Sequence, residues 1–226
     1  NLPSEEVLAV ANGRVERMAQ GMEGLLEKRT TERVSESEPA ETTPDQEPSV
    51  AVEKLIEREV AKPKDNRSWW QWELAAQAAK SNEKRDAIYR EGIEALPHSA
   101  ELASNYAVYL HYVRKEYDEA EQMYKKTLEL DPGNAGNTGN YAIFLKDIRK
   151  NYDEAERMYK KALELDPTNA IHTGNYAIFL KDIRKDYDEA ERMYKKALEL
   201  DPTNAIHTGN YAVYLHYVRK EYDEAE

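Results

Sequence analysis

Apolar residues along this chain follow the spacing of amphipathic helices, and the same spacing returns several times. Between positions 141 and 148, apolar residues are separated by three, one and three positions, which places them on one face of a helix: Tyr141, Phe144, Leu145 and Ile148. The polar segment 149–151 follows directly. The pattern predicts a helix that ends in a short turn.

A second amphipathic helix is predicted from about Asp153 to Leu165. Its apolar face comprises Ala155, Tyr159, Ala162 and Leu163. Pro167 ends this helix because it cannot donate a backbone hydrogen bond. Asn169 is a preferred N-cap residue, so it begins the next helix. The chain therefore contains pairs of helices joined by turns.

This pair of helices is a unit that repeats every 35 residues. The triplet Asn-Tyr-Ala begins in each copy at an equivalent position: Asn105, Asn140, Asn175 and Asn210. A period of this size indicates supersecondary units that stack on one another. Residues 105–121 and 210–226 are identical, which indicates recent duplication or deliberate construction.

The repeating unit resembles the tetratricopeptide repeat. Small residues occupy the positions where that family's helices pack most closely: Ala142, Ala155 and Ala162. A proline ends each second helix: Pro132, Pro167 and Pro202. The resemblance is strong over residues 100–226 and weaker over 67–99. The family's unit has about 34 residues, so we expect the additional residue here to lie in the first helix or its turn.

The resemblance implies an all-α fold, a right-handed superhelical solenoid of stacked antiparallel helical hairpins with a helical N-terminal extension. The array is expected over residues 67–226, as a degenerate hairpin at 67–99, repeats near 100–134, 135–169 and 170–204, and a truncated unit at 205–226. A terminal repeat normally has a polar cap. The last unit lacks one, so we expect this sequence to be part of a longer array.

The N-terminal third divides into three segments. Residues 1–29 are predicted to form an amphipathic helical segment, because apolar residues from Leu8 to Leu25 alternate spacings of three and four. We expect this helix either to pack on the array or a neighbouring domain, or to self-associate as a coiled coil. Residues 30–49 are expected to be a disordered acidic linker rich in Pro, Ser and Thr, and residues 50–66 to contain a short helix. Three tryptophans follow at the start of the array, where we expect them to cap its hydrophobic layer: Trp69, Trp70 and Trp72.

Composition narrows the classes of function. The formal net charge is −12, so the chain offers no basic face for nucleic acid. No apolar run approaches the roughly 20 residues that cross a bilayer. The absence of Cys excludes thiol nucleophiles and Cys-zinc sites. It is compatible with the cytoplasm, which is the favoured location, although the sequence does not fix the compartment.

No residue pattern predicts catalysis, a metal or a cofactor. The chain has no nucleophile elbow, phosphate loop or zinc motif. His172 and His207 recur in adjacent units without an acidic partner at ligand spacing, so we expect a solvated or packing role for them. The chain is therefore not expected to be an enzyme.

The resemblance implies that first-helix residues line the concave wall of the superhelix and form a peptide-binding groove. Asparagine in this column is expected to hydrogen-bond the backbone of an extended peptide; the alternative is that each Asn braces its own hairpin or the neighbouring one. The predicted groove residues are Asn105, Asn140, Asn175, Asn210, Ile143, Ile178, Lys146, Lys181, Asp147, Asp182, Val108, Tyr112, Val213 and Tyr217. Gly139 and Gly174 are expected to lie on the same wall.

The predicted function is that of an adaptor or scaffold that binds a protein or peptide in this groove. Two alternatives remain open. In the first, the array is a sensor or regulatory arm of a larger multidomain enzyme or signalling protein. In the second, it is a self-assembly element. Self-assembly would use residues 4–28 or the uncapped C-terminal hairpin.

Overall fold

The computed structural model describes residues 63–219, and all regular structure in that range is helical. The predictions for residues 1–29, for the linker at 30–49 and for most of the short helix at 50–66 lie outside the described residues. Backbone contacts divide the chain into two compact units, the first ending at Asn105 and the second beginning at Tyr106.

The first unit consists of a short 3₁₀ turn and a helical hairpin, followed by the start of a further helix. Its elements are η1 (Lys64–Asn66), α3 (Trp69–Gln77), α4 (Asn82–Ala95) and the first half of α5 (Ala100–Tyr109). Trp72 is buried, and its ring lies against the backbone of Gly92, where an added Cβ would meet it at 3.1 Å. The Tyr89 hydroxyl donates to the buried carboxylate of Glu73 over 2.9 Å, which satisfies that carboxylate within the hairpin.

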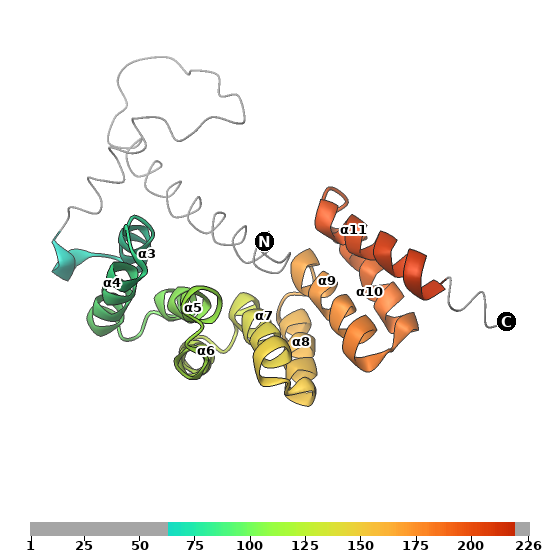
Figure 1. Cartoon of the computed structure of the whole chain (residues 1–226), viewed down its shortest axis with the longest axis horizontal. Helices are drawn as coiled ribbons and strands as arrows, with labels where there is room; N and C mark the ends of the chain where they lie inside the picture. Colours follow the sequence, from blue (N-terminus) through green and yellow to red (C-terminus); the bar gives the residue numbers. More distant parts are fainter. Residues whose placement is uncertain (1–62, 220–226) are drawn as a thin grey trace, which may run out of the picture. The chain divides into compact units, whose positions relative to one another are not determined.

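The second unit repeats one order of elements, in which a first helix ends in a π-helical turn and a second helix follows (Figure 1). After α5 come η2 (Leu110–Arg114), α6 (Tyr117–Leu130), α7 (Ala135–Phe144), η3 (Leu145–Arg149), α8 (Tyr152–Leu165), α9 (Ala170–Phe179), η4 (Leu180–Arg184), α10 (Tyr187–Leu200), α11 (Ala205–Tyr214) and η5 (Leu215–Arg219). First helices pack on the second helix of their own hairpin, as α7 does on α8 and α9 does on α10.

Asparagine side chains begin the first helices. The side-chain oxygen of Asn169 accepts from the backbone N–H of His172 at 3.0 Å, and Asn134 accepts from Asn137 at the same distance. Such caps satisfy backbone donors that have no partner in the first turn. The N-cap predicted at Asn169 is confirmed.

The first helices α7 and α9 each end in a π-helical turn that is followed by a residue with left-handed backbone. In the hairpin of α7 and α8, the π turn spans Leu145–Arg149 and Lys150 follows with φ 54°. A π turn contains more residues than an α turn, and single π turns arise where one residue is inserted into a helix. The π turns therefore lie in the part of the unit where the additional residue is expected.

A tyrosine at the centre of each second helix joins consecutive hairpins. Tyr159 of α8 is fully buried, and its ring centroid lies 5.9 Å from that of Tyr176 and 5.4 Å from that of Phe179, both on α9. Tyr124 and Tyr194 make the equivalent contacts with the helices that follow them. The second unit is thus a solenoid of helical hairpins with an aromatic cluster at each junction between hairpins.

Candidate interaction surface and the contacts between hairpins

The predicted asparagine column lies on the first helices. Asn140, Asn175 and Asn210 occupy equivalent positions of α7, α9 and α11, whereas Asn105 belongs to α5 in the first unit. Asn140 and Asn210 are half-buried, and Asn105 and Asn175 are buried. Among the hydrogen bonds within residues 63–219, none involves the side-chain amide of Asn140, Asn175 or Asn210. Within this range, no hydrogen bond supports the alternative role, in which these asparagines would brace the hairpins.

The other predicted groove residues differ widely in exposure. Ile143 and Val108 are only 2% and 3% exposed, so they present almost no surface to a ligand. Lys146 is buried too, and its ammonium group lies 3.3 Å from the carboxylate of Asp147. The next hairpin is more open: Ile178 and Lys181 are half-buried, and Lys181 pairs at 3.3 Å with the exposed Asp182.

The aromatic residues predicted at the two ends of the groove are also unequal. The Tyr112 ring is half-buried and stacks on His111 with their centroids 3.9 Å apart. In the last hairpin, Val213 and Tyr217 are 48% and 63% exposed. The open apolar surface of the second unit is therefore concentrated on α11 and η5.

Histidines and glycines interlock the first helices. The ring of His172 on α9 lies against Gly139 of α7, so closely that an added Cβ on Gly139 would be 2.3 Å from Cε1 of His172. His207 on α11 lies in the same way against Gly174, at 2.5 Å. The expectation that Gly139 and Gly174 line a groove wall is wrong, because histidines of the next hairpin cover them.

Both histidines are buried, which confirms a packing role and not a solvated one. Burial lowers the pKa of His207, and the opposing effect of nearby Asp201 is smaller. Among residues 63–219, no group of three potential ligands is placed to hold a metal ion. The same range holds no helix that combines the length and apolarity needed to cross a membrane.

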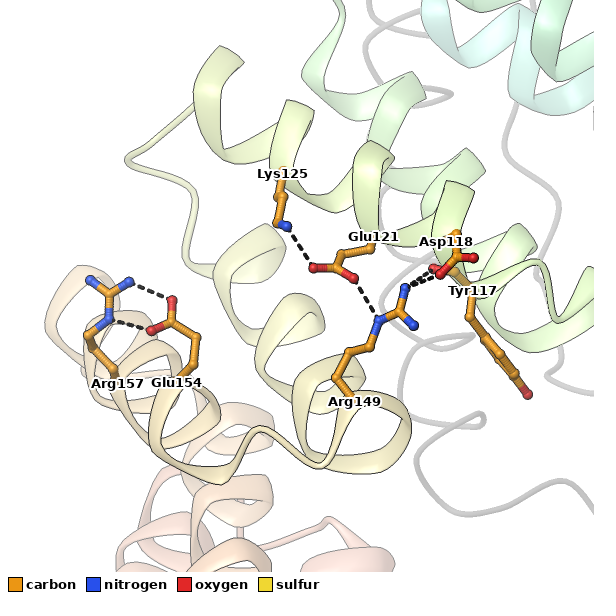
Figure 2. A network of polar contacts seen from close by, with 7 residues as sticks. All are labelled: Tyr117, Asp118, Glu121, Lys125, Arg149, Glu154 and Arg157. Carbon is orange, nitrogen blue, oxygen red and sulfur yellow. Dashed lines mark hydrogen bonds and ion pairs between the residues drawn. The ribbon is translucent and has the colours of Figure 1, made fainter.

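Arg149, at the end of η3, binds the second helix of the preceding hairpin (Figure 2). The guanidinium of Arg149 donates to Asp118 and Glu121 of α6, each at 2.6 Å, and to the backbone carbonyl of Tyr117 at 3.3 Å. Arg184 repeats this arrangement one hairpin later: it bonds Asp153 at 2.6 Å and Glu156 at 2.7 Å. We name each of these arrangements an arginine clamp.

In both arginine clamps the pKa of the glutamate is lowered. Burial by itself would raise the pKa of Glu121, but hydrogen bonds from Lys125 and Arg149 outweigh it and leave that pKa below its usual value. The pKa of Glu156 is lowered for the same reason by Lys160 and Arg184. Sequence reasoning assigned Arg149 only to a turn. The signal it missed is that this arginine and its acidic partners recur together in every complete unit.

The fold defines the class of the protein: it is a helical-repeat solenoid, built from hairpins that stack through small and aromatic residues. One family model of the tetratricopeptide repeat matches residues 158–192, and a second matches residues 145–169 and 181–204. The chain therefore carries tetratricopeptide repeats over residues 145–204.

Solved structures with the same fold share little sequence with this chain. PilF of Pseudomonas aeruginosa superposes with a TM-score of 0.57 and 22% identity, over 75% of this chain and 72% of that one. MamA superposes with a TM-score of 0.50 and 16% identity, over 59% of this chain and 77% of that one. The first TPR domain of human RPAP3 superposes with a TM-score of 0.50 and 23% identity, over 56% of this chain and 98% of that one. A search of curated proteins returns no match.

At these identities the solved structures show the fold alone, and the sequence matches to the repeat carry the assignment of class. Tetratricopeptide repeats are protein–protein interaction modules, so the chain contains such a module.

Proposed function

We propose that the chain is an adaptor or scaffold that binds an extended peptide or a partner helix along its first helices. The observation that carries the proposal is the column formed by Asn140, Asn175 and Asn210. These side chains recur at equivalent positions, and none of their amides makes a hydrogen bond within residues 63–219. We name this surface the asparagine column.

The chemistry of an amide suits a peptide ligand. Its oxygen accepts and its nitrogen donates, which matches the donor and acceptor of a peptide unit whatever the side chains of the ligand are. Half-buried Ile178 and Lys181 and exposed Asp182 lie on the same hairpin as Asn175 and its π turn. They would add one apolar contact and a pair of opposite charges, so we expect a ligand that is neither strongly acidic nor strongly basic.

The test is a double substitution in the full chain, Asn140→Ala with Asn175→Ala. Partners are first captured from a lysate and identified by mass spectrometry, and the affinity of the purified partner is then measured by calorimetry. Two lost hydrogen bonds of roughly 0.5–1.5 kcal/mol each predict an affinity that is roughly 5- to 150-fold weaker. Circular dichroism should show unchanged helicity.

A matched control is Gln122→Ala, which removes an exposed amide from the second helix α6. It should leave the affinity unchanged. If the double variant binds as tightly as the parent chain, or if it unfolds, the asparagine column is not the binding site.

A further inference from the structure

Two junctions between first helices contain a buried histidine that fits over a glycine of the preceding hairpin. His172 of α9 lies against Gly139 of α7, and His207 of α11 lies against Gly174 of α9. The two histidines are only 6% and 4% exposed. An added Cβ on either glycine would lie within 2.5 Å of a ring atom, so each ring fills the hollow that the missing side chain leaves. We name each of these pairs a histidine socket.

The surroundings of His207 suit a neutral imidazole and not a charged one. Its Nε2 atom is buried and makes no hydrogen bond within residues 63–219. The titratable side chains of α9, which carries the glycine, are His172 and Tyr176, and neither is an acid that could pair with a charged ring. Asp201, directly after α10, is the charged group close enough to influence His207. A buried charge without a hydrogen-bond acceptor is costly.

Asp201 does not offset this cost, because other groups already bind its carboxylate. Its Oδ1 accepts hydrogen bonds from the backbone N–H and the hydroxyl of Thr203, at 3.2 and 2.8 Å. Its Oδ2 accepts from the side-chain nitrogen of Asn204 at 3.3 Å. Burial therefore outweighs the attraction of Asp201 and lowers the pKa of His207.

The socket of His172 is built in the same way. Asp166 precedes this histidine at the equivalent position, and its carboxylate accepts hydrogen bonds from Thr168 and Asn169. Helix α7, which carries the glycine of this socket, has no acidic or basic side chain. The two sockets thus repeat one environment in consecutive hairpins.

We propose that the histidine sockets are a pH-sensitive switch between consecutive first helices. They hold these helices together while the imidazoles are neutral, and they release them when the imidazoles are protonated, because a charged ring must leave its hollow to reach water. Release would also disturb the asparagine column, since the two socket glycines directly precede Asn140 and Asn175. That consequence rests on the proposed function, whereas the release of the helices does not.

The sign of the effect follows from the lowered pKa of His207. The socket contributes its full stability above the histidine pKa of the unfolded chain, which is about 6.5, and loses it as the pH falls below that value. The switch therefore acts at mildly acidic pH, above the range in which carboxylates titrate.

Amide hydrogen exchange of the full chain at pH 7.5 and 5.5 tests the proposal. The rates are expressed as protection factors, which remove the intrinsic effect of pH on exchange. We expect the protection of α9 and α11 to fall at pH 5.5 by up to about tenfold for each histidine, the limit for a group with an unfolded pKa near 6.5. The hairpin of α3 and α4 contains no histidine and should keep its protection.

The matched variant replaces both histidines with the residue that the array itself uses one hairpin earlier. Asn137 of α7 occupies the position equivalent to His172, and it is buried as well. His172→Asn with His207→Asn should therefore fold and should abolish the pH response of α9 and α11. His98→Asn, which alters an exposed histidine, should preserve that response.

A third buried histidine is unchanged in all of these variants. Nδ1 of His111 lies 3.2 Å from the hydroxyl of Tyr124, so this ring has a polar partner inside its own hairpin. A pH response that the parent chain and the double variant share is therefore no support for the sockets. Only the difference between these two chains counts.

A second measurement needs no variant. Histidines labelled with ¹³C at Cε1 give five resonances, one for each histidine of the chain. We expect at least one of them to titrate well below pH 6.5, over the range in which α9 and α11 lose protection. If all five titrate near or above 6.5, the proposal is overturned. It is overturned as well if the double variant keeps the pH response of the parent chain, or if α3 and α4 lose as much protection as α9 and α11.

Discussion

Gly174 and Gly209 have the same neighbours in sequence, since both lie in the segment Ile-His-Thr-Gly-Asn-Tyr-Ala. Their surroundings nevertheless differ completely. The ring of His207 covers Gly174, whereas, apart from neighbouring residues of its own helix, no atom lies within 4 Å of the place where a Cβ of Gly209 would stand. Whether a side chain fits at such a glycine is therefore decided by the next hairpin and not by the local sequence.

This difference predicts opposite effects of one substitution. Gly174→Ala should lower the free energy of unfolding by roughly 1–3 kcal/mol, because the new methyl group collides with a buried ring. Gly209→Ala should raise it by roughly 0.5–1 kcal/mol, because alanine favours a helix. Urea unfolding followed by circular dichroism measures both values. Equal effects at the two positions would show that His207 does not occupy the socket at Gly174.

Some residue roles follow from the sequence and others do not. The Asn169 cap was predictable because a cap acts on the turn directly after it. The contact of His172 with Gly139 was not, because the partners lie in different units and one unit does not reveal which of its residues face the next. The burial of Ile143 and Val108 escaped prediction for the same reason.

At the scale of the element, the π turns end in a lysine with left-handed backbone geometry. Lys115, Lys150 and Lys185 have φ of 59°, 54° and 57°. A side chain in this region is strained, and the residue that most often ends a helix in this way is glycine. The sequence thus uses a charged residue where backbone preference favours glycine.

Replacing Lys150 and Lys185 with Gly should therefore stabilise the chain by roughly 0.5–1 kcal/mol per site, the relief of strain less the entropy of glycine. The midpoint of thermal unfolding should rise accordingly. Lys160→Gly in the interior of α8 is the control, and it should lower the stability by about 1 kcal/mol. A fall in stability for the double variant would mean that the two lysine side chains stabilise the turn by contacts of their own.

The helices themselves were largely predictable, because apolar periodicity and proline positions mark them. The second helix predicted from about Asp153 to Leu165 is observed as Tyr152–Leu165. The π turn was not predictable. An additional residue can lie inside the first helix, as in a π turn, or in the turn after that helix. The hydrophobic pattern of the sequence is the same in these two cases, so it does not distinguish them.

At the scale of the whole molecule, the second unit depends on junctions between hairpins, because each hairpin of a solenoid contacts only its neighbours. The period of 35 residues was enough to predict this architecture, since a recurring amphipathic unit must stack to bury its apolar face. The arginine clamps add polar contacts at these junctions, between Arg149 and α6 and between Arg184 and α8.

Removing both clamps with Arg149→Met and Arg184→Met should lower stability at neutral pH by about 0.2–1 kcal/mol for each lost ion pair, as for other exposed pairs. The pKa values of Glu121 and Glu156 are lowered in the folded chain. The ion pairs of these two glutamates therefore stabilise the folded chain fully at pH values above the glutamate pKa in the unfolded chain. This stabilisation is lost as the pH falls through the lower pKa that the glutamates have in the folded chain.

The difference in stability between the parent chain and this double variant should accordingly shrink as pH falls below about 4, the usual pKa range of carboxylates. Urea unfolding at several pH values measures it, and Arg192→Met, which removes a pair within α10, controls for a general effect of charge. A difference that does not change with pH would mean that the arginines act through packing alone.

The histidine sockets also give the array a direction. At every junction between first helices from α7 to α11, the unit nearer the N-terminus contributes the hollow and the unit nearer the C-terminus contributes the ring. Removal of residues 170–204 would bring His207 to the sequence position of His172, opposite Gly139, so the shortened array would close with the same fit. Whole units are therefore interchangeable parts, and the array can change in length through recombination without a new junction having to arise.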